Sequence, residues 1–262
     1  MGDKELYKAG DIGQEEIERL KHIEYPNYVS ETVLNGIDLE SKRVLDVGAG
    51  PNAKLAEFVH GRKGEYVSLD VRADVLEEMK KKLEAIGVPF YGVRADVKAL
   101  PFADGAFDVV HQRFVLMNIK PETRRQALEE VLRVGKKDIV LIEYNWEYLK
   151  STESPEIIER FRSLAFQIMG RFSTDPYMGK KFEELFEEVA PGLNYSLQGF
   201  RREEDMANTP EVILVLKGMQ QISKNVLKDE GLSEEARRLI EELSKTPVKL
   251  SPPEVVVATI KM

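Results

Sequence analysis

The chain contains no cysteine among its 262 residues. A disulfide framework, a thiolate zinc site and a cysteine nucleophile are therefore excluded. Only three histidines are present, with no H-E-x-x-H motif and no acidic cluster at metal-ligand spacing, so we expect no metal site. Any chemistry must rest on oxygen and nitrogen groups.

Long apolar segments are missing as well. No stretch approaches roughly eighteen uncharged apolar residues, and residues 1–20 lack the apolar run of a secretory signal, so we expect a cytoplasmic protein without a membrane span. Acidic residues outnumber basic ones by 46 to 38, and the net charge of -8 opposes binding to nucleic acid or an anionic membrane. We therefore expect a small-molecule partner. The abundance of Lys and Glu without cysteine is thermophile-like, and the sequence gives no sign of the oligomeric state.

Short apolar runs alternate with amphipathic stretches through the middle of the chain. After N-terminal helices within residues 1–42, broken at Pro26, the pattern predicts five strands, at 43–47, 65–71, 89–96, 106–112 and 138–144. Helical patterns separate these strands. The alternation predicts an α/β fold, with a parallel sheet wrapped by helices on both faces.

The stretch RVLDVGAGPN, residues 43–52, runs from a buried strand into a glycine turn. Gly48, Gly50 and Ala53 satisfy the G-x-G-x-x-[G/A] fingerprint of dinucleotide binding, and Asp70 follows about twenty residues later. These residues alone allow a nicotinamide cofactor, whose ribose hydroxyls would donate to Asp70.

Three observations favour a cationic ligand instead. Asp46 lies inside the first strand, where a second carboxylate would gain nothing from a pyrophosphate. Asp96 ends the third strand, so three successive strands carry an acid near the same edge. No separate catalytic domain follows. An adenosine that carries an ammonium and a sulfonium group fits this acidic edge better than a dinucleotide.

These segments resemble the class I S-adenosylmethionine-dependent methyltransferases of the small-molecule type. The similarity covers about residues 14–145 and rests on an ordered set of motifs: VLDVGAGPN, SLDVRADVLEEMKKKL and RADVKALPFADGAFDVVHQRFVLMNI. It implies a Rossmann-like, doubly wound sheet of seven strands with an antiparallel seventh strand. The cofactor would be S-adenosylmethionine and the product S-adenosylhomocysteine.

The resemblance assigns the adenosine end of the cofactor to four residues. Asp70 would bind the ribose hydroxyls and Val71 would pack on the adenine ring. Asp96 would accept a hydrogen bond from the adenine amino group, beside the backbone of Val97.

The same resemblance assigns the methionine end of the cofactor to the glycine turn and the residues near it. Asp46, Gly48 and Gly50 would flank the methionine moiety, and Gln112 takes the place of a residue whose carbonyl faces the cofactor ammonium. Asn52 replaces a glycine that is frequent in the family. Since asparagine tolerates left-handed backbone angles, we expect the turn to survive there.

The last third of the chain departs from the strand and helix alternation. Helical patterns at 153–172 and 178–190 precede a strand at 194–201, and two more helices precede a last strand at 254–262. We interpret 1–262 as one methyltransferase domain, with a cofactor-binding core at 43–146 and helical cap insertions at 147–180 and 202–252. Both caps would lie over the carboxyl edge of the sheet, where open sheets bind ligands.

No general base can be assigned from the sequence. The candidates for catalysis or substrate contact are His111, Arg113, Asn118, Tyr144 and Tyr28, although the position of His111 inside a strand favours a structural histidine. The asparagine-proline-proline-aromatic run of nucleobase amino methylation is absent after the fourth strand. We therefore expect in-line methyl transfer to an oxygen, nitrogen or carbon nucleophile of a small or medium-sized substrate.

Two other classes of protein remain open at this point. The fingerprint also suits an NAD-dependent oxidoreductase, and the fold also suits a catalytically silent methyltransferase-like binding module. The two differ in the ligands they bind: the first binds NAD, and the second binds the sulfonium cofactor without an acceptor.

Overall fold

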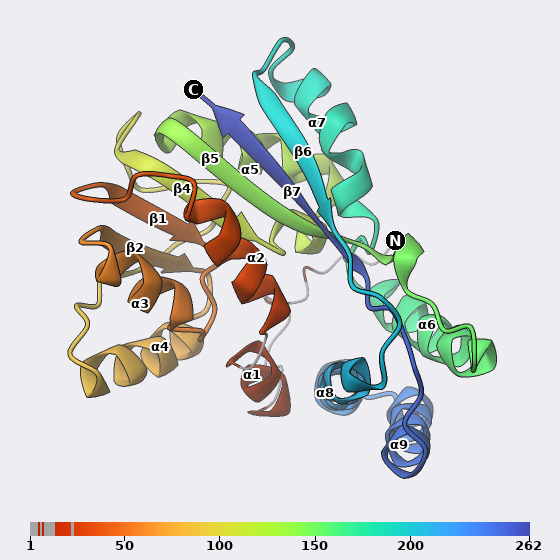
Figure 1. Ribbon diagram of the computed structural model, residues 1–262. Coiled ribbons are helices and arrows are strands. Elements are labelled where there is room, and N and C mark those ends of the chain that lie inside the picture. The colour runs from red at the N-terminus through yellow and green to blue at the C-terminus, as the bar shows by residue number, and fades with distance from the viewer. Residues whose placement is uncertain (1–4, 6, 8–13, 22–23) are drawn as a thin grey trace.

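The computed structural model describes residues 5, 7, 14–21 and 24–262. They contain one seven-stranded sheet in the order β3-β2-β1-β4-β5-β7-β6 (Figure 1). The strands are β1 (Arg43–Val47), β2 (Glu65–Asp70), β3 (Gly92–Arg94), β4 (Phe107–Arg113), β5 (Gly135–Asn145), β6 (Tyr195–Phe200) and β7 (Glu254–Lys261). Strands β1 to β5 pair in parallel, whereas β7 runs antiparallel to both β5 and β6. The expected Rossmann-like sheet with an antiparallel seventh strand is confirmed.

Helices cover both faces of the sheet, as predicted. One face carries α2 (Tyr25–Leu34), α3 (Lys54–Gly61) and α4 (Ala73–Ala85), and the other carries α5 (Pro121–Val134) and α7 (Phe182–Val189). Strand residues alternate between the two cores: Val44 packs with the first group of helices, and Leu45 with the second. Asp46 therefore shares the face of Val44, below α2.

A third group of helices has its own hydrophobic core. It contains α6 (Pro155–Met169), α8 (Thr209–Ile222) and α9 (Glu230–Lys245), which meet through buried side chains such as Phe161, Leu216 and Leu239. Figure 1 shows this group beyond the sheet, with α8 beside α1 (Gln14–Lys21). Gly218 allows α1 and α8 to approach closely, because a Cβ atom there would lie 2.1 Å from Glu16 Oε2.

The structure corrects three predicted boundaries. The third strand spans only 92–94 instead of 89–96, because this edge strand pairs with β2 at just three positions. The fifth strand begins earlier, at Gly135. Pro26 does not break a helix: it lies in the first turn of α2, where its missing N–H costs no helical hydrogen bond.

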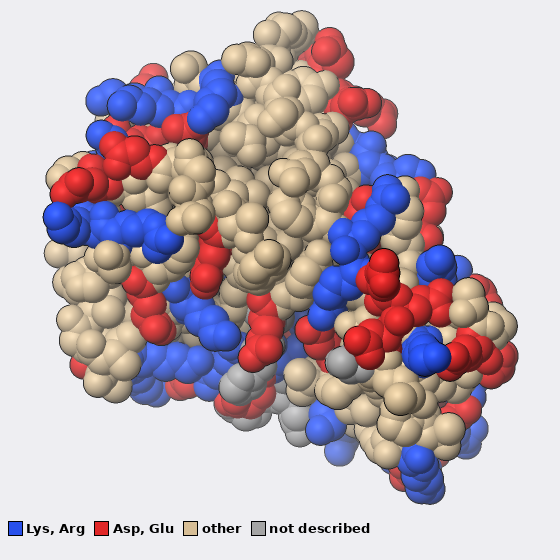
Figure 2. All heavy atoms as spheres, viewed as in Figure 1, with Lys and Arg blue, Asp and Glu red and all other residues tan. Residues whose placement is uncertain are grey.

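The surface and the helices agree with the high content of charged residues, 32% of the chain, and with the lack of long apolar runs. In Figure 2, basic and acidic side chains lie next to one another around a broad area without charged residues. Among the helices that the structure describes, none combines the length and the apolar character needed to cross a membrane.

A buried polar network joins the sheet to α2. The Tyr66 hydroxyl donates to Asp46 Oδ2 at 2.5 Å, and His111 Nδ1 lies 2.7 Å from Asp46 Oδ1. The other ring nitrogen of His111 lies 3.0 Å from Ser30 Oγ, on α2. The network thus connects β1, β2 and β4 to the helix above them.

We predict that Tyr66→Phe lowers the free energy of unfolding by about 1–3 kcal/mol, because the buried Asp46 carboxylate loses a donor. Urea unfolding measures the change. Tyr91→Phe is the control, since Tyr91 is 54% exposed. Equal stabilities of the two variants would contradict a structural role for the network.

Candidate active site

One cavity opens at the carboxyl ends of β1, β2, β4 and β5. Its walls come from the segments after β1, β2, β3 and β4, from the end of β5, and from α1, α6 and α8. Most of the predicted cofactor residues line it, namely Gly48, Gly50, Asn52, Asp70, Val71, Asp96 and Val97.

The two glycines of the turn have different roles. Both have positive φ, +70° at Gly48 and +62° at Gly50, which glycine adopts without strain. A Cβ atom at Gly48 would lie 2.3 Å from Val115, so this glycine allows the turn to pack against the loop after β4. A Cβ atom at Gly50 would have nothing within 4 Å. The backbone at Gly50 is therefore open to a ligand in the cavity.

Asn52 does not use the left-handed conformation that the sequence suggested, because the positive φ angles of this turn belong to Gly48 and Gly50. Its Oδ1 accepts from the backbone N–H of Lys54 at 2.9 Å, at the start of α3. Its Nδ2 donates to the carbonyl of Lys21 at 3.2 Å. The Asn52 side chain therefore connects the turn to the end of α1 by a hydrogen bond.

Asp70 combines a local role with a place in the cavity wall. Its Oδ2 accepts from Gly50 N at 3.0 Å and its Oδ1 from Arg72 N at 2.9 Å. Burial raises the pKa of Asp70, and the two backbone donors oppose this shift. The carboxylate thus fixes the glycine turn and still lines the cavity.

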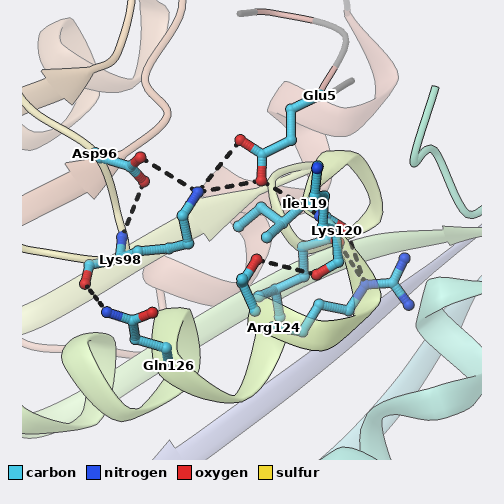
Figure 3. A network of polar contacts seen from close by, with 9 residues as sticks. Glu5, Asp96, Lys98, Ile119, Lys120, Arg124 and Gln126 are labelled. Carbon is cyan, nitrogen blue, oxygen red and sulfur yellow. Dashed lines mark hydrogen bonds and ion pairs between the residues drawn. The ribbon is translucent and has the colours of Figure 1, made fainter. Parts of the chain in front are cut away.

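Asp96 belongs to a network that includes the N-terminal segment (Figure 3). Its Oδ1 accepts from Lys98 N at 3.1 Å, and its Oδ2 lies 3.2 Å from Lys98 Nζ. The same ammonium binds Glu5 at 3.1 and 3.2 Å, and Glu5 also accepts from Lys120 N at 3.3 Å. Glu5 therefore lies against this end of the cavity.

Sequence reasoning missed the contribution of α1 and the residues before it. The Tyr7 hydroxyl donates to Glu16 at 3.0 Å, and Arg19 binds Glu16 through Nε at 2.8 Å and Nη2 at 2.7 Å. All three residues line the cavity. The spacing of Glu16 and Arg19 signals a helical ion pair, but nothing in the sequence signals its position over the sheet.

Four predicted site residues lie outside the cavity wall. Asp46 and His111 face α2 in the buried network, and Tyr28 is 62% exposed. The side-chain amide of Gln112 is buried and has no hydrogen-bond partner among the described residues. The structure thus brings together the turn and the acids that follow β2 and β3, but not these four side chains.

Three other candidates do line the cavity: Arg113, Asn118 and Tyr144. Asn118 is held by the carbonyl of Phe114 at 2.8 Å and by the hydroxyl of Thr174 at 3.0 Å. Tyr144 stacks on Phe114, with ring centroids 4.0 Å apart and 12° between the planes. Burial raises the pKa of Tyr144 to about 12, so its hydroxyl stays protonated at neutral pH.

Phe114 has a φ of +57°, which is a strained conformation for an aromatic residue. Its backbone N–H still donates to the carbonyl of Ile142 on β5, at 2.8 Å. The strain therefore lies at the point where the chain leaves the sheet and lines the cavity.

Glu143 positions the loop after β4 from the neighbouring strand. It is buried, and its Oε1 accepts from the backbone N–H of Leu116 at 2.7 Å. Its Oε2 is buried without a partner in the described part of the chain. Burial raises the pKa of Glu143 to about 8, although nearby backbone N–H groups and Arg124 oppose the shift.

The described residues contain no group of three or more histidine, aspartate or glutamate side chains that could hold a metal ion. The cavity instead combines the exposed backbone of the glycine turn, the carboxylates of Asp70 and Asp96, and a wall formed by helices α1, α6 and α8. A glycine turn after β1 in a 3-2-1-4-5-7-6 sheet is an arrangement that binds nucleoside cofactors at its carboxyl edge.

Comparisons with known proteins agree with this arrangement. Residues 44–163 match the family described as methyltransferase domain. The ubiquinone/menaquinone biosynthesis C-methyltransferase UbiE of Shewanella sp. (strain W3-18-1) is 28% identical over 193 residues, which cover 71% of this chain and 70% of UbiE.

Two solved structures share the fold. YcgJ from Bacillus subtilis gives a TM-score of 0.61 at 16% identity and covers 89% of this chain and 98% of its own. The second is the phosphoethanolamine N-methyltransferase 2 of Haemonchus contortus, solved with phosphomonomethylethanolamine and S-adenosylhomocysteine. Its TM-score is 0.56 at 13% identity, and the match covers 90% of this chain and 52% of that protein. The family match and the similarity to UbiE support a class I S-adenosylmethionine-dependent methyltransferase, and the two solved structures show the shared fold.

We predict that Glu143→Gln changes how stability depends on pH. The carboxyl of the folded protein has a raised pKa, so it holds a proton that the unfolded chain releases at lower pH. Its contribution is fully present below the unfolded pKa of roughly 4.3 and is lost as pH rises toward about 8. The stability of the wild type relative to Glu143→Gln should therefore fall over this range.

Chemical unfolding at a series of pH values measures this difference. Glu184→Gln, at an exposed position of α7, is the control and should show no such trend relative to the wild type. Parallel curves for the wild type and Glu143→Gln would show that the carboxyl of Glu143 does not retain its proton.

Proposed function

We propose that the cavity binds S-adenosylmethionine along its acidic edge and that a small acceptor is enclosed below α6 and α8. The observation that carries the proposal is that one cavity is lined both by the segments after β1, β2 and β3 and by these two helices. Cofactor and acceptor can therefore meet in a single space. In this arrangement α6, α8 and α9 act as the cap.

The residues at the acidic edge fit the adenosine of this cofactor. Asp70 has lone pairs left for ribose hydroxyls after its two backbone hydrogen bonds, and Asp96 can accept from the adenine amino group. Val71 and Val97 line the cavity beside these carboxylates and offer apolar surface for the ring. Gly50 leaves space where a side chain would intrude.

S-adenosylmethionine supplies a methyl group on a sulfonium: the acceptor's lone pair forms the new bond to that carbon, and the electrons of the broken carbon–sulfur bond remain on sulfur as S-adenosylhomocysteine. The protein contributes mainly by position. Holding the nucleophile at attack distance can supply about 7–11 kcal/mol of the barrier. The apolar side chains of α6 and α8 exclude water from this step.

We propose that no side chain acts as a strong base. Tyr144 stays protonated, since its pKa is raised to about 12. His111 lies outside the cavity wall, with both ring nitrogens engaged by Asp46 and Ser30. Methyl transfer then needs a nucleophile that is already deprotonated or that releases its proton to water.

The two alternative classes have no support. None of the relatives described above is an NAD-dependent oxidoreductase, and the similarity to the C-methyltransferase UbiE covers 70% of that enzyme. We therefore propose an active methyltransferase with a small-molecule acceptor.

We predict that Asp70→Asn weakens binding of S-adenosylhomocysteine at least about tenfold, because charge-assisted hydrogen bonds are each worth about 1.5–3 kcal/mol. Calorimetry with S-adenosylhomocysteine, S-adenosylmethionine and NAD measures this effect. The wild type should bind both sulfur compounds and should not bind NAD.

Asp38→Asn is a matched control for this experiment. Asp38 accepts from the backbone N–H two residues later, at 3.1 Å, as Asp70 does, but it is exposed and outside the cavity. Its substitution should leave cofactor affinity unchanged. Tight binding of NAD, or equal affinities of the two variants, would count against the proposed site.

A further inference from the structure

Four arginines line the cavity, and three of them face a carboxylate. Arg19 lies 2.7 Å from Glu16, Arg72 lies 2.5 Å from Asp74, and Arg202 forms an ion pair with Glu211; the fourth is Arg113. In the described ranges, Arg113 has no carboxylate oxygen within 4.0 Å of its guanidinium. Its positive charge therefore faces the cavity without an ion-pair partner from those residues.

The hydrogen bonds of Arg113 hold it in place through uncharged partners; burial lowers its pKa, and the charge of Asp46, beyond 4.0 Å, opposes this shift. Nη1 donates to Asn27 Oδ1 at 2.7 Å and to Ser30 Oγ at 3.2 Å, and both acceptors are uncharged. Nε and Nη2 donate to no described residue, and they are not among the fully buried orphaned nitrogens. An arginine whose orientation is fixed on one side and whose remaining donors are accessible is suited to bidentate binding of an anion.

The carboxylates that act electrostatically on Arg113, those of Asp46 and Glu31, lie outside the cavity wall, whereas two neighbours inside it carry donors. The Tyr144 hydroxyl, which interacts electrostatically with Arg113, stays protonated. Trp146 is 5% exposed, lines the cavity, and its Nε1 has no partner among the described residues.

The rest of this wall is apolar. Phe161 and Ile168 of α6 and Val212 and Met219 of α8 are buried, and all of them line the cavity. The ligand recognised here therefore combines an anionic group with an apolar body.

The sheet order separates Arg113 from the adenosine end. Arg113 ends β4, where it pairs with Ile142 of β5, whereas Asp70 ends β2, on the other side of β1. Adjacent strands are about 4.8 Å apart, so two strand spacings separate these positions. Arg113 thus lies on the opposite side of β1 from the residues proposed to bind the adenosine.

We propose that the methyl acceptor is a small organic acid, whose carboxylate binds Arg113 and whose apolar body packs between α6 and α8. This inference rests on the proposed function, because it assigns the acceptor of the same cavity. Arg113 is then the residue that selects acids over their neutral analogues.

The test uses wild-type protein loaded with S-adenosylhomocysteine and three pairs of probes: 3-phenylpropanoate, octanoate and indole-3-acetate, each with its primary amide. The amide keeps the shape of the acid and removes its charge. In calorimetric titrations we expect at least one acid to bind tenfold or more tightly than its amide. Equal binding within every pair, or no binding of any acid, would overturn the inference.

Two substitutions assign the preference to Arg113. Arg113→Gln should abolish the preference for the acid, and Arg113→Lys should retain part of it, because a lysine keeps the charge but loses the planar fork. Arg125→Gln removes the same charge from an exposed position on α5, where Arg125 binds Glu129, and should leave the preference intact. An acid preference that survives in folded Arg113→Gln overturns the inference. If that variant does not fold, the inference is tested by the acid and amide affinities of the wild type and of Arg113→Lys.

The carboxylate could also be that of the cofactor itself, and a second arm separates the two sources. S-adenosylhomocysteine carries an amino-acid carboxylate, whereas 5′-methylthioadenosine lacks it. If Arg113 binds the acceptor, Arg113→Gln should leave the affinities for both compounds unchanged. A loss confined to S-adenosylhomocysteine would overturn the inference. Wild-type protein that binds neither compound would instead refute the proposed function.

Discussion

The structure depends on one buried carboxylate, that of Asp46. It is 5% exposed and is held by the Tyr66 hydroxyl and by the His111 ring. A buried carboxylate without partners is costly, so β1, β2 and β4 must keep the register that brings these groups together. The second nitrogen of His111 continues the network to Ser30, which also accepts from Arg113. The orientation of a cavity-lining guanidinium is thus linked to the pairing of the three central strands.

The helical wall of the cavity, formed by α1, α6 and α8, depends on contacts between segments that are far apart in the chain. α1 lies against α8 because Gly218 leaves room for Glu16, and Glu16 in turn holds Arg19 and Tyr7. At the other end, Glu5 bridges to Lys98, which contacts Asp96. Glu5 and α1 therefore close the cavity on two sides. A bound ligand would be enclosed by the sheet edge below and by α1, α6 and α8 above.

Much of the fold could be predicted from the sequence because it follows from local patterns. Alternating apolar and amphipathic runs specify parallel strands and covering helices, and the glycine turn with Asp70 specifies the ligand edge. Edge strands are harder to delimit, as the third strand shows, because partial exposure weakens their apolar pattern. The direction of a side chain is harder still. Asp46 is two residues from the glycine turn, yet strand alternation directs it to the face below α2.

The contributions of Glu5, Tyr7 and Arg19 could not be predicted from the sequence. They depend on tertiary contacts, such as the one between Glu16 of α1 and Gly218 of α8, which are far apart in the chain. The strained backbone of Phe114 gives no local signal either, because nothing in its side chain favours a positive φ. Tertiary contacts impose it, through the Ile142 carbonyl and the stacked ring of Tyr144.

Charge is distributed unevenly in the cavity, and this distribution separates its two proposed ligands. Asp70 and Asp96 lie where β2 and β3 end, and they favour a cofactor that carries positive charge. The guanidinium that has no carboxylate partner among the described residues, Arg113, lies on the β5 side of β1. Because the walls between these positions are largely apolar, the effective dielectric is low and each charge is felt strongly. A cationic cofactor beside the acids and an anionic acceptor on Arg113 would neutralise both ends, and their mutual attraction would bring the nucleophile toward the sulfonium methyl group.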